Sequence, residues 1–100
     1  MYLLNGNFAV GAMNAEELSS VFSNNDFNSR FESSSVTLFN QIEIRMDKGM
    51  CSFYLESEDI NQLTSNSEMI SEALKDKNIL HVIEVADEDW NTLHEYTYER

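Results

Sequence analysis

Residues 36–55 read VTLFNQIEIRMDKGMCSFYL, and this stretch decides the fold. Apolar side chains recur at every second position from Val36 to Met46, with one polar interruption at Asn40. This alternation is typical of a half-buried strand, and we expect a β-bulge at Asn40. Asp47-Lys48-Gly49 then predicts a three-residue hairpin loop with glycine in the left-handed conformation. The same alternation continues over residues 51–55, so the stretch predicts an antiparallel hairpin.

Two segments carry the signals of a helix N-terminus. Asn14-Ala15-Glu16-Glu17 and Ser65-Asn66-Ser67-Glu68 each place a capping side chain three residues before a glutamate, as in a capping box. Apolar residues at helical spacing follow both segments. We expect one helix after Asn14 and another after Ser65. An extra turn over residues 60–63 is left open.

The remaining segments favour β-structure. Residues 2–13 predict one strand, or a small hairpin if Asn5-Gly6 forms a tight turn. Residues 79–86 are β-branched and nearly apolar on both faces, which predicts an interior strand. Residues 90–98 favour a strand, with a short helix left open.

The resulting order is strand, helix, strand, strand, helix, strand, which is the order of the split βαβ, or ferredoxin-like, sandwich. We therefore expect an α+β fold with a four- to five-stranded, mainly antiparallel sheet and both helices on one face. A chain of 100 residues corresponds to a single domain spanning residues 1–100.

The chain is strongly acidic. Six Lys and Arg residues stand against eighteen Asp and Glu residues, so the formal net charge is −12 at pH 7. Residues 1–50 carry six acids and three bases, a net −3, whereas residues 51–100 carry twelve acids and three bases, a net −9. Binding to nucleic acid or to an anionic membrane depends on Lys and Arg. We expect neither as a direct ligand.

Cysteine usage and the N-terminal sequence indicate a reducing compartment. Cys51 is the one cysteine, so no internal disulfide can form. Residues 1–13 have no basic region and are interrupted by Asn5-Gly6-Asn7, unlike a signal peptide. No apolar run approaches the ~18–20 residues that span a bilayer. We expect a cytoplasmic protein.

The residue types that carry catalysis or bind metals form no complete motif. His81 lies in an apolar strand and is interpreted as a core residue, and Cys51 alternates with buried positions, as an inert thiol does. His94 has no second histidine at helical spacing. Residues 87–91 resemble the opening of a calcium-binding EF-hand loop, but Thr92 replaces the required glycine. We predict no enzymatic activity, no cofactor and no metal.

Acidic residues follow two predicted strands, and aromatic residues lie among those near the C-terminus. Carboxylates two residues apart on a strand are separated by about 6.6 Å, comparable with neighbouring phosphates of a nucleic-acid strand. Exposed aromatics are typical interface anchors. The predicted partner-binding residues are Glu56, Glu58, Asp59, Asp87, Glu88, Asp89, Trp90, Glu95, Tyr96 and Tyr98.

These features favour a small acidic inhibitor that binds a basic nucleic-acid-binding protein or ribonucleoprotein and blocks its access to nucleic acid. Phage-encoded anti-CRISPR proteins and anti-restriction DNA mimics are small acidic domains of this physical class. One alternative is an immunity protein that neutralises a cognate nuclease toxin. Others are a small ligand-binding or enzymatic α+β domain and a scaffold subunit. A homodimer formed through an open sheet edge is also left open.

Overall fold

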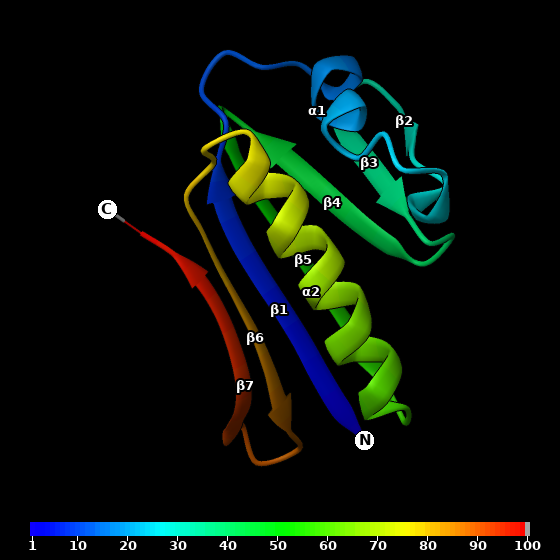
Figure 1. Cartoon of the computed structure of the whole chain (residues 1–100), viewed down its shortest axis with the longest axis vertical. Helices are drawn as coiled ribbons and strands as arrows, with labels where there is room; N and C mark the ends of the chain where they lie inside the picture. Colours follow the sequence, from blue (N-terminus) through cyan, green and yellow to red (C-terminus); the bar gives the residue numbers. More distant parts are fainter. Residues whose placement is uncertain (100) are drawn as a thin grey trace.

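The computed structural model describes residues 1–99 and shows one antiparallel sheet with both helices on one face (Figure 1). The elements, in chain order, are β1 (Tyr2–Ala9), α1 (Ala15–Val21), the 3-10 helix η1 (Asn25–Phe27), β2 (Arg30–Phe31), β3 (Ser35–Leu38), β4 (Ile42–Asp47), β5 (Met50–Ser57), α2 (Ile60–Asp76), β6 (His81–Asp87) and β7 (Thr92–Tyr98). The strand order across the sheet is β2-β3-β4-β5-β1-β6-β7. The predicted α+β class, antiparallel pairing and placement of the helices are confirmed.

The core lies between the helices and one face of the sheet. Alternate residues of β1, such as Leu4 and Phe8, face the helices, and Leu18 of α1 and Ile70 of α2 pack against that face. The opposite face of the sheet, which we call the open face, carries no helix (Figure 1). Any functional surface on the open face therefore consists of strand side chains and loops.

The sheet has seven strands, more than the four to five predicted, and the main reason is the turn at Phe39-Asn40. Both residues have positive φ, 57° and 60°, and the chain reverses so that Leu38 pairs with Ile42. The expected bulge at Asn40 is therefore wrong, because the apparent single strand is the β3–β4 hairpin. Leu38 and Ile42 are four residues apart, so the apolar alternation keeps its phase across the turn.

The β4–β5 hairpin is present, but its loop is shorter than predicted. Asp47 pairs with Met50, which leaves a two-residue turn of Lys48 and Gly49. Both have positive φ, 52° and 81°, as in the type I′ turn that matches strand twist. Gly49 is also required by packing, since a Cβ there would lie 2.7 Å from the carbonyl oxygen of Gly11.

β1 is one continuous strand, so the alternative turn at Asn5-Gly6 does not form. Gly6 pairs with Phe53 of β5 on one side and with Ile83 of β6 on the other. A Cβ on Gly6 would lie 2.1 Å from Cζ of Phe53. Glycine is present here because the Phe53 ring occupies the space of a side chain.

The helix starts differ in how well the sequence predicts them. Asn14 caps α1 in a capping box, accepting from the Glu17 N–H (2.8 Å) while the Glu17 carboxylate accepts from the Asn14 N–H (3.1 Å). α2 instead begins after Asp59, whose carboxylate accepts from the Gln62 N–H at 3.1 Å. The predicted start after Ser65 is wrong because residues 60–63 are already helical, as the open alternative allowed.

Candidate partner-binding surface

Three adjacent strands bring the acidic segments at residues 56–58 and 87–89 to the same end of the sheet. Tyr2, at the start of β1, pairs with Ser57 at the end of β5 and with Asp87 at the end of β6. The two acidic segments therefore flank β1, about two strand spacings, or ~10 Å, apart. Figure 1 shows this end of the sheet at the label N, beside the β6–β7 connection. We call the surface formed by Glu56, Glu58, Asp87, Glu88, Asp89 and Trp90 the acidic end.

One cation lies within the acidic end. The amino group of Met1 lies 2.7 Å from Oε1 of Glu88 and 3.5 Å from Oε2 of Glu58. The hydrogen bond to Glu88 is the main reason that the pKa of this amino group is raised. Within residues 1–99, no Lys or Arg side chain forms an ion pair with the acidic end. Glu56, Glu58, Glu88 and Asp89 are exposed, and among the described residues the Met1 amino group is the one positive group paired with the acidic end.

Asp87 organises the loop between β6 and β7. Its carboxylate accepts from the N–H groups of Asn91 (3.0 Å) and Asp89 (2.9 Å) and from the Asn91 side-chain amide (3.2 Å). The backbone bond from Asn91 is the largest cause of the lowered pKa of Asp87. The spacing that resembles a calcium loop thus forms a carboxylate-capped turn, in which Asp87 has a structural role.

Trp90 lies on this turn in an unusual conformation. Its φ is +64°, and its N–H donates to the carbonyl oxygen of Asp87 at 3.0 Å. The side chain is 61% exposed, and its ring lies 6.2 Å, centre to centre, from that of Tyr54. A bulky side chain in the left-handed region costs about 1–2 kcal/mol relative to the ordinary helical region. Such an outlier motivates a functional hypothesis for the exposed indole.

Tyr54 extends the acidic end onto the open face, and the sequence analysis missed it. Alternation along β5 places Tyr54 opposite to Phe53, which packs in the core. The Tyr54 hydroxyl donates to Oε1 of Glu56 at 2.8 Å, and this bond is the main cause of the raised pKa of Tyr54. The aromatic pair Tyr54–Trp90 therefore adjoins the carboxylates. The sequence signal for Tyr54 is its position in the strand: it is an aromatic residue at one of the alternate positions that face away from the core.

Two buried residues near this aromatic pair belong to the open face. Leu3 pairs with Ala86 across β1 and β6, and both point away from the helices because Leu4 points toward them. They are 6% and 4% exposed and lie outside the main core cluster. Both side chains are buried, so they form a small apolar cluster beneath the open face and no exposed patch.

The other predicted site residues are Asp59, which directly follows Glu58, and three residues of β7. Asp59 caps α2, and Glu95 lies on β7, where its carboxylate accepts from the Thr97 hydroxyl at 2.7 Å. Tyr96 packs against the core. Tyr98 pairs with His81 at the far end of β7, and its hydroxyl donates to the side chain of Asn78 at 3.2 Å. The structure therefore does not bring Glu95, Tyr96 and Tyr98 together with Trp90.

Cys51 and His81 do not form a nucleophile–base pair. Phe8 of β1 lies between them, since it pairs with Cys51 on one side and His81 on the other. Burial raises the pKa of the Cys51 thiol to about 11, which disfavours the reactive thiolate. Among residues 1–99, no cluster of three His, Cys, Asp or Glu side chains could hold a metal ion.

His81 is buried and hydrogen-bonded as a neutral ring. Nδ1 donates to the carbonyl oxygen of Ile79 (2.9 Å), so Nε2 accepts from the Ser71 hydroxyl (2.7 Å). Burial is the main cause of a pKa lowered from its usual 6.5; it outweighs the hydrogen bond to the Ile79 carbonyl, which raises the pKa, and Lys75 has a smaller lowering effect. Below pH 6.5 the unfolded chain therefore takes up a proton before the folded chain does, and stability falls.

We expect His81→Gln to lower the free energy of unfolding by about 1–3 kcal/mol near pH 7.5, because a buried hydrogen-bonded group is replaced. The difference from the unmodified chain should shrink as the pH falls below 6.5, where the stabilisation by neutral His81 is lost. Urea unfolding from pH 7.5 to 5 measures this. His94→Gln, at an exposed position, is the control. A difference for His81→Gln that is constant with pH would contradict the assignment.

Comparisons with known proteins add no functional information. No protein-family model, curated protein or solved structure matches the chain. None of the helices within residues 1–99 combines the length and the apolar character needed to cross a bilayer. The geometry of the acidic end is therefore the basis for the functional proposal.

Proposed function

We propose that the chain is an inhibitor that acts by binding, without catalysis. It docks through the acidic end on the basic surface of a nucleic-acid-binding protein or ribonucleoprotein and blocks access of nucleic acid. The observation that carries the proposal is the convergence of five carboxylates and an exposed tryptophan at one end of the sheet. A surface shaped for binding nucleic acid carries Lys and Arg, and this surface complements it in charge.

The spacing of the carboxylates supports the proposal. Glu56 and Glu58 lie on one side of β1, and Glu88 and Asp89 lie on the other, so the negative charge extends over about two strand spacings. The Tyr54–Trp90 pair adjoins these carboxylates, since the Tyr54 hydroxyl donates to Glu56. Long-range attraction then accelerates encounter, and burial of the aromatic pair slows dissociation.

Finer assignments follow as part of the same proposal. We place the protein in the cytoplasm, among anti-defence inhibitors of the phage anti-CRISPR or DNA-mimic type. An immunity protein against a nuclease toxin would use the same surface. We also propose that β1, α1, β4, β5, α2 and β6 form a split βαβ core, extended at its edges by β2, β3 and β7. The strand order β4-β5-β1-β6 supports this assignment.

Gene order and hydrogen exchange test the proposal together. If a toxin gene lies immediately upstream, that toxin is taken as the target for the experiment. If the gene lies in a cluster of phage genes, a host defence nuclease is taken instead. In the complex with the selected target, we expect slowed amide exchange at residues 54–58 and 87–91 and at the nucleic-acid-binding residues of the target. Protection confined to another face of this chain, or to a target surface remote from nucleic acid, would overturn the proposal.

We expect Trp90→Ala to raise the dissociation rate of that complex about tenfold, which corresponds to about 1.4 kcal/mol of binding free energy. The association rate should change little, and the effect should persist at high salt, because it arises from lost apolar contact. Surface plasmon resonance measures both rates. Leu80→Ala, which removes an exposed apolar side chain at the far end of β6, is the matched control. Equal effects of the two substitutions would rule out Trp90 as an anchor.

A further inference from the structure

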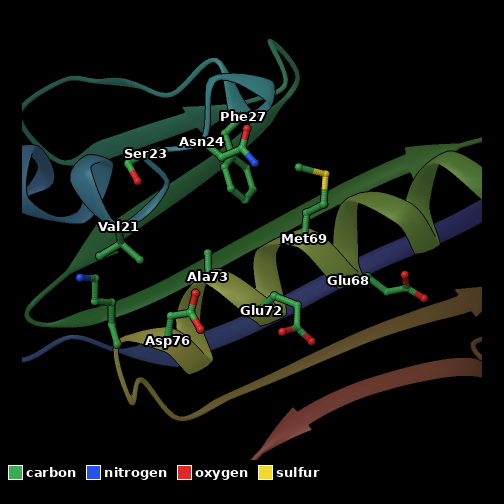
Figure 2. Close-up of a pocket in the computed structure, with 10 residues that line it drawn as sticks. Val21, Ser23, Asn24, Phe27, Glu68, Met69, Glu72, Ala73 and Asp76 are labelled. Atoms are coloured by element: carbon green, nitrogen blue, oxygen red, sulfur yellow. The ribbon is translucent and has the colours of Figure 1, made fainter.

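A groove separates α2 from the segment that joins α1 to η1 (Figure 2). Its volume is about 510 Å³, within the range of about 300–1,000 Å³ typical of ligand sites. Val21, Asn24 and Phe27 line one side, and Met69 and Ala73 of α2 line the other. Figure 2 shows Met69 and Ala73 directed toward that first side. The groove therefore has apolar walls and lies away from the acidic end, toward the C-terminal half of α2.

A row of carboxylates follows the outer side of α2 beside the groove, and Figure 2 shows Glu68 and Glu72 directed away from the α1–η1 side. Glu68, Glu72 and Asp76 also line the groove, each four residues from the next. Successive members of such a row are about 6 Å apart, one helical turn. All three are exposed, and none forms an ion pair among the described residues, while Lys77 is the one basic residue in the lining. The groove thus combines an apolar surface with a negative margin.

We propose that this groove binds a basic segment of a partner protein, with Arg or Lys side chains spaced by one helical turn. The aliphatic part of each long side chain would lie on Met69 and Ala73, and its charged group would reach across to the carboxylates on the outer side of α2. A helical segment matches best, because its residues four apart have the same spacing as the carboxylates. Phosphate-bearing ligands are repelled by the same row.

This site uses residues distinct from the acidic end and stands independently of the proposed function. Its fit to a basic segment rests on charge complementarity together with the apolar walls. Carboxylates alone would attract any cation, whereas the half-buried Met69 and Ala73 add apolar contact area for aliphatic stems. The two requirements can be separated experimentally, since one substitution can fill the groove while leaving every charge in place.

The test uses the full chain and a designed peptide as the probe. The peptide is an alanine-rich helix of about 18 residues with arginine at every fourth position, long enough to be partly helical in water. A second peptide of the same composition has its arginines scattered around the helix. Titration of the isotope-labelled chain, followed by amide chemical shifts, should locate the ordered peptide at residues 21–27 and 68–77. It should bind at least about tenfold more tightly than the scattered peptide.

Three variants decide between the groove and unspecific attraction. Glu68→Gln/Glu72→Gln/Asp76→Asn and Ala73→Trp should each weaken binding at least about tenfold, and Ala73→Trp changes no charge. Glu32→Gln/Asp47→Asn/Glu99→Gln removes three exposed acids elsewhere and should change the affinity less than about twofold. Shifts spread over the acidic end, equal affinity for both peptides, or equal losses in the two triple variants would overturn the proposal. Shifts of the unmodified chain give the answer even if a variant does not fold.

Discussion

Reversing three carboxylates of the acidic end, as Glu56→Lys/Glu88→Lys/Asp89→Lys, should slow association with the target by about 10²-fold. The change moves the local charge by six units at the surface that we propose meets the basic partner, and electrostatic steering alters association rates by roughly 10–10³-fold. The effect should shrink as salt is raised, because exposed charges are screened beyond a Debye length of about 10 Å at 0.1 M. Surface plasmon resonance at low and high salt measures it.

The choice of these three residues follows from the structure. Asp87 is left intact because its carboxylate holds the β6–β7 turn, and its loss would confuse misfolding with lost charge. The control Glu16→Lys/Asp26→Lys/Glu32→Lys reverses three exposed acids at the α1 end of the molecule. If this control slowed association as much as the test variant, net charge rather than the acidic end would govern encounter.

Replacing Gly6 with alanine should lower the free energy of unfolding by about 1–3 kcal/mol, the range for inserting atoms into a packed core. The added Cβ would meet three ring atoms of Phe53, at 2.1, 2.3 and 2.8 Å. Either the ring or the central strands β1 and β5 must shift. Thermal or urea unfolding measures the loss.

Two further variants isolate the cause. Gly11→Ala introduces a Cβ where no atom lies within 4 Å, so its cost reports only the positive φ of +61°. Phe53→Leu removes the ring, so Gly6→Ala should cost distinctly less in that background. A cost that is the same with and without the Phe53 ring would show that Gly6 is required for another reason.

Where the sequence predicts the fold correctly, local chemistry and packing agree. The Asn14 capping box, the β4–β5 hairpin and the interior strand at β6 each combine a turn or cap signal with a matching apolar period. The sequence does not predict the turn at Phe39-Asn40, because the turn contains no glycine and two non-glycine residues adopt positive φ there. α2 began earlier than predicted because Asp59 and Ser65 are both good caps, and tertiary burial of Leu63 favours the longer helix.

The sequence predicts only part of the candidate site, because the site depends on which strands pair. Acids that end β5 and β6 are visible in the chain, but their proximity depends on both strands pairing with β1. The role of Asp87 in the turn and the partnership of Tyr54 with Trp90 depend on side-chain geometry that no periodicity encodes. The groove beside Met69 likewise requires the packing of α1 and η1 against α2.

Competition with nucleic acid tests the central claim most directly. The target, freed of nucleic acid, is mixed with a fluorescent oligonucleotide that it binds, and the chain is titrated in while anisotropy is followed. We predict complete displacement, with an apparent oligonucleotide affinity that falls in proportion to the concentration of the chain. Glu56→Lys/Glu88→Lys/Asp89→Lys should displace it only at much higher concentration. Undiminished oligonucleotide binding while the chain saturates the target would contradict the account.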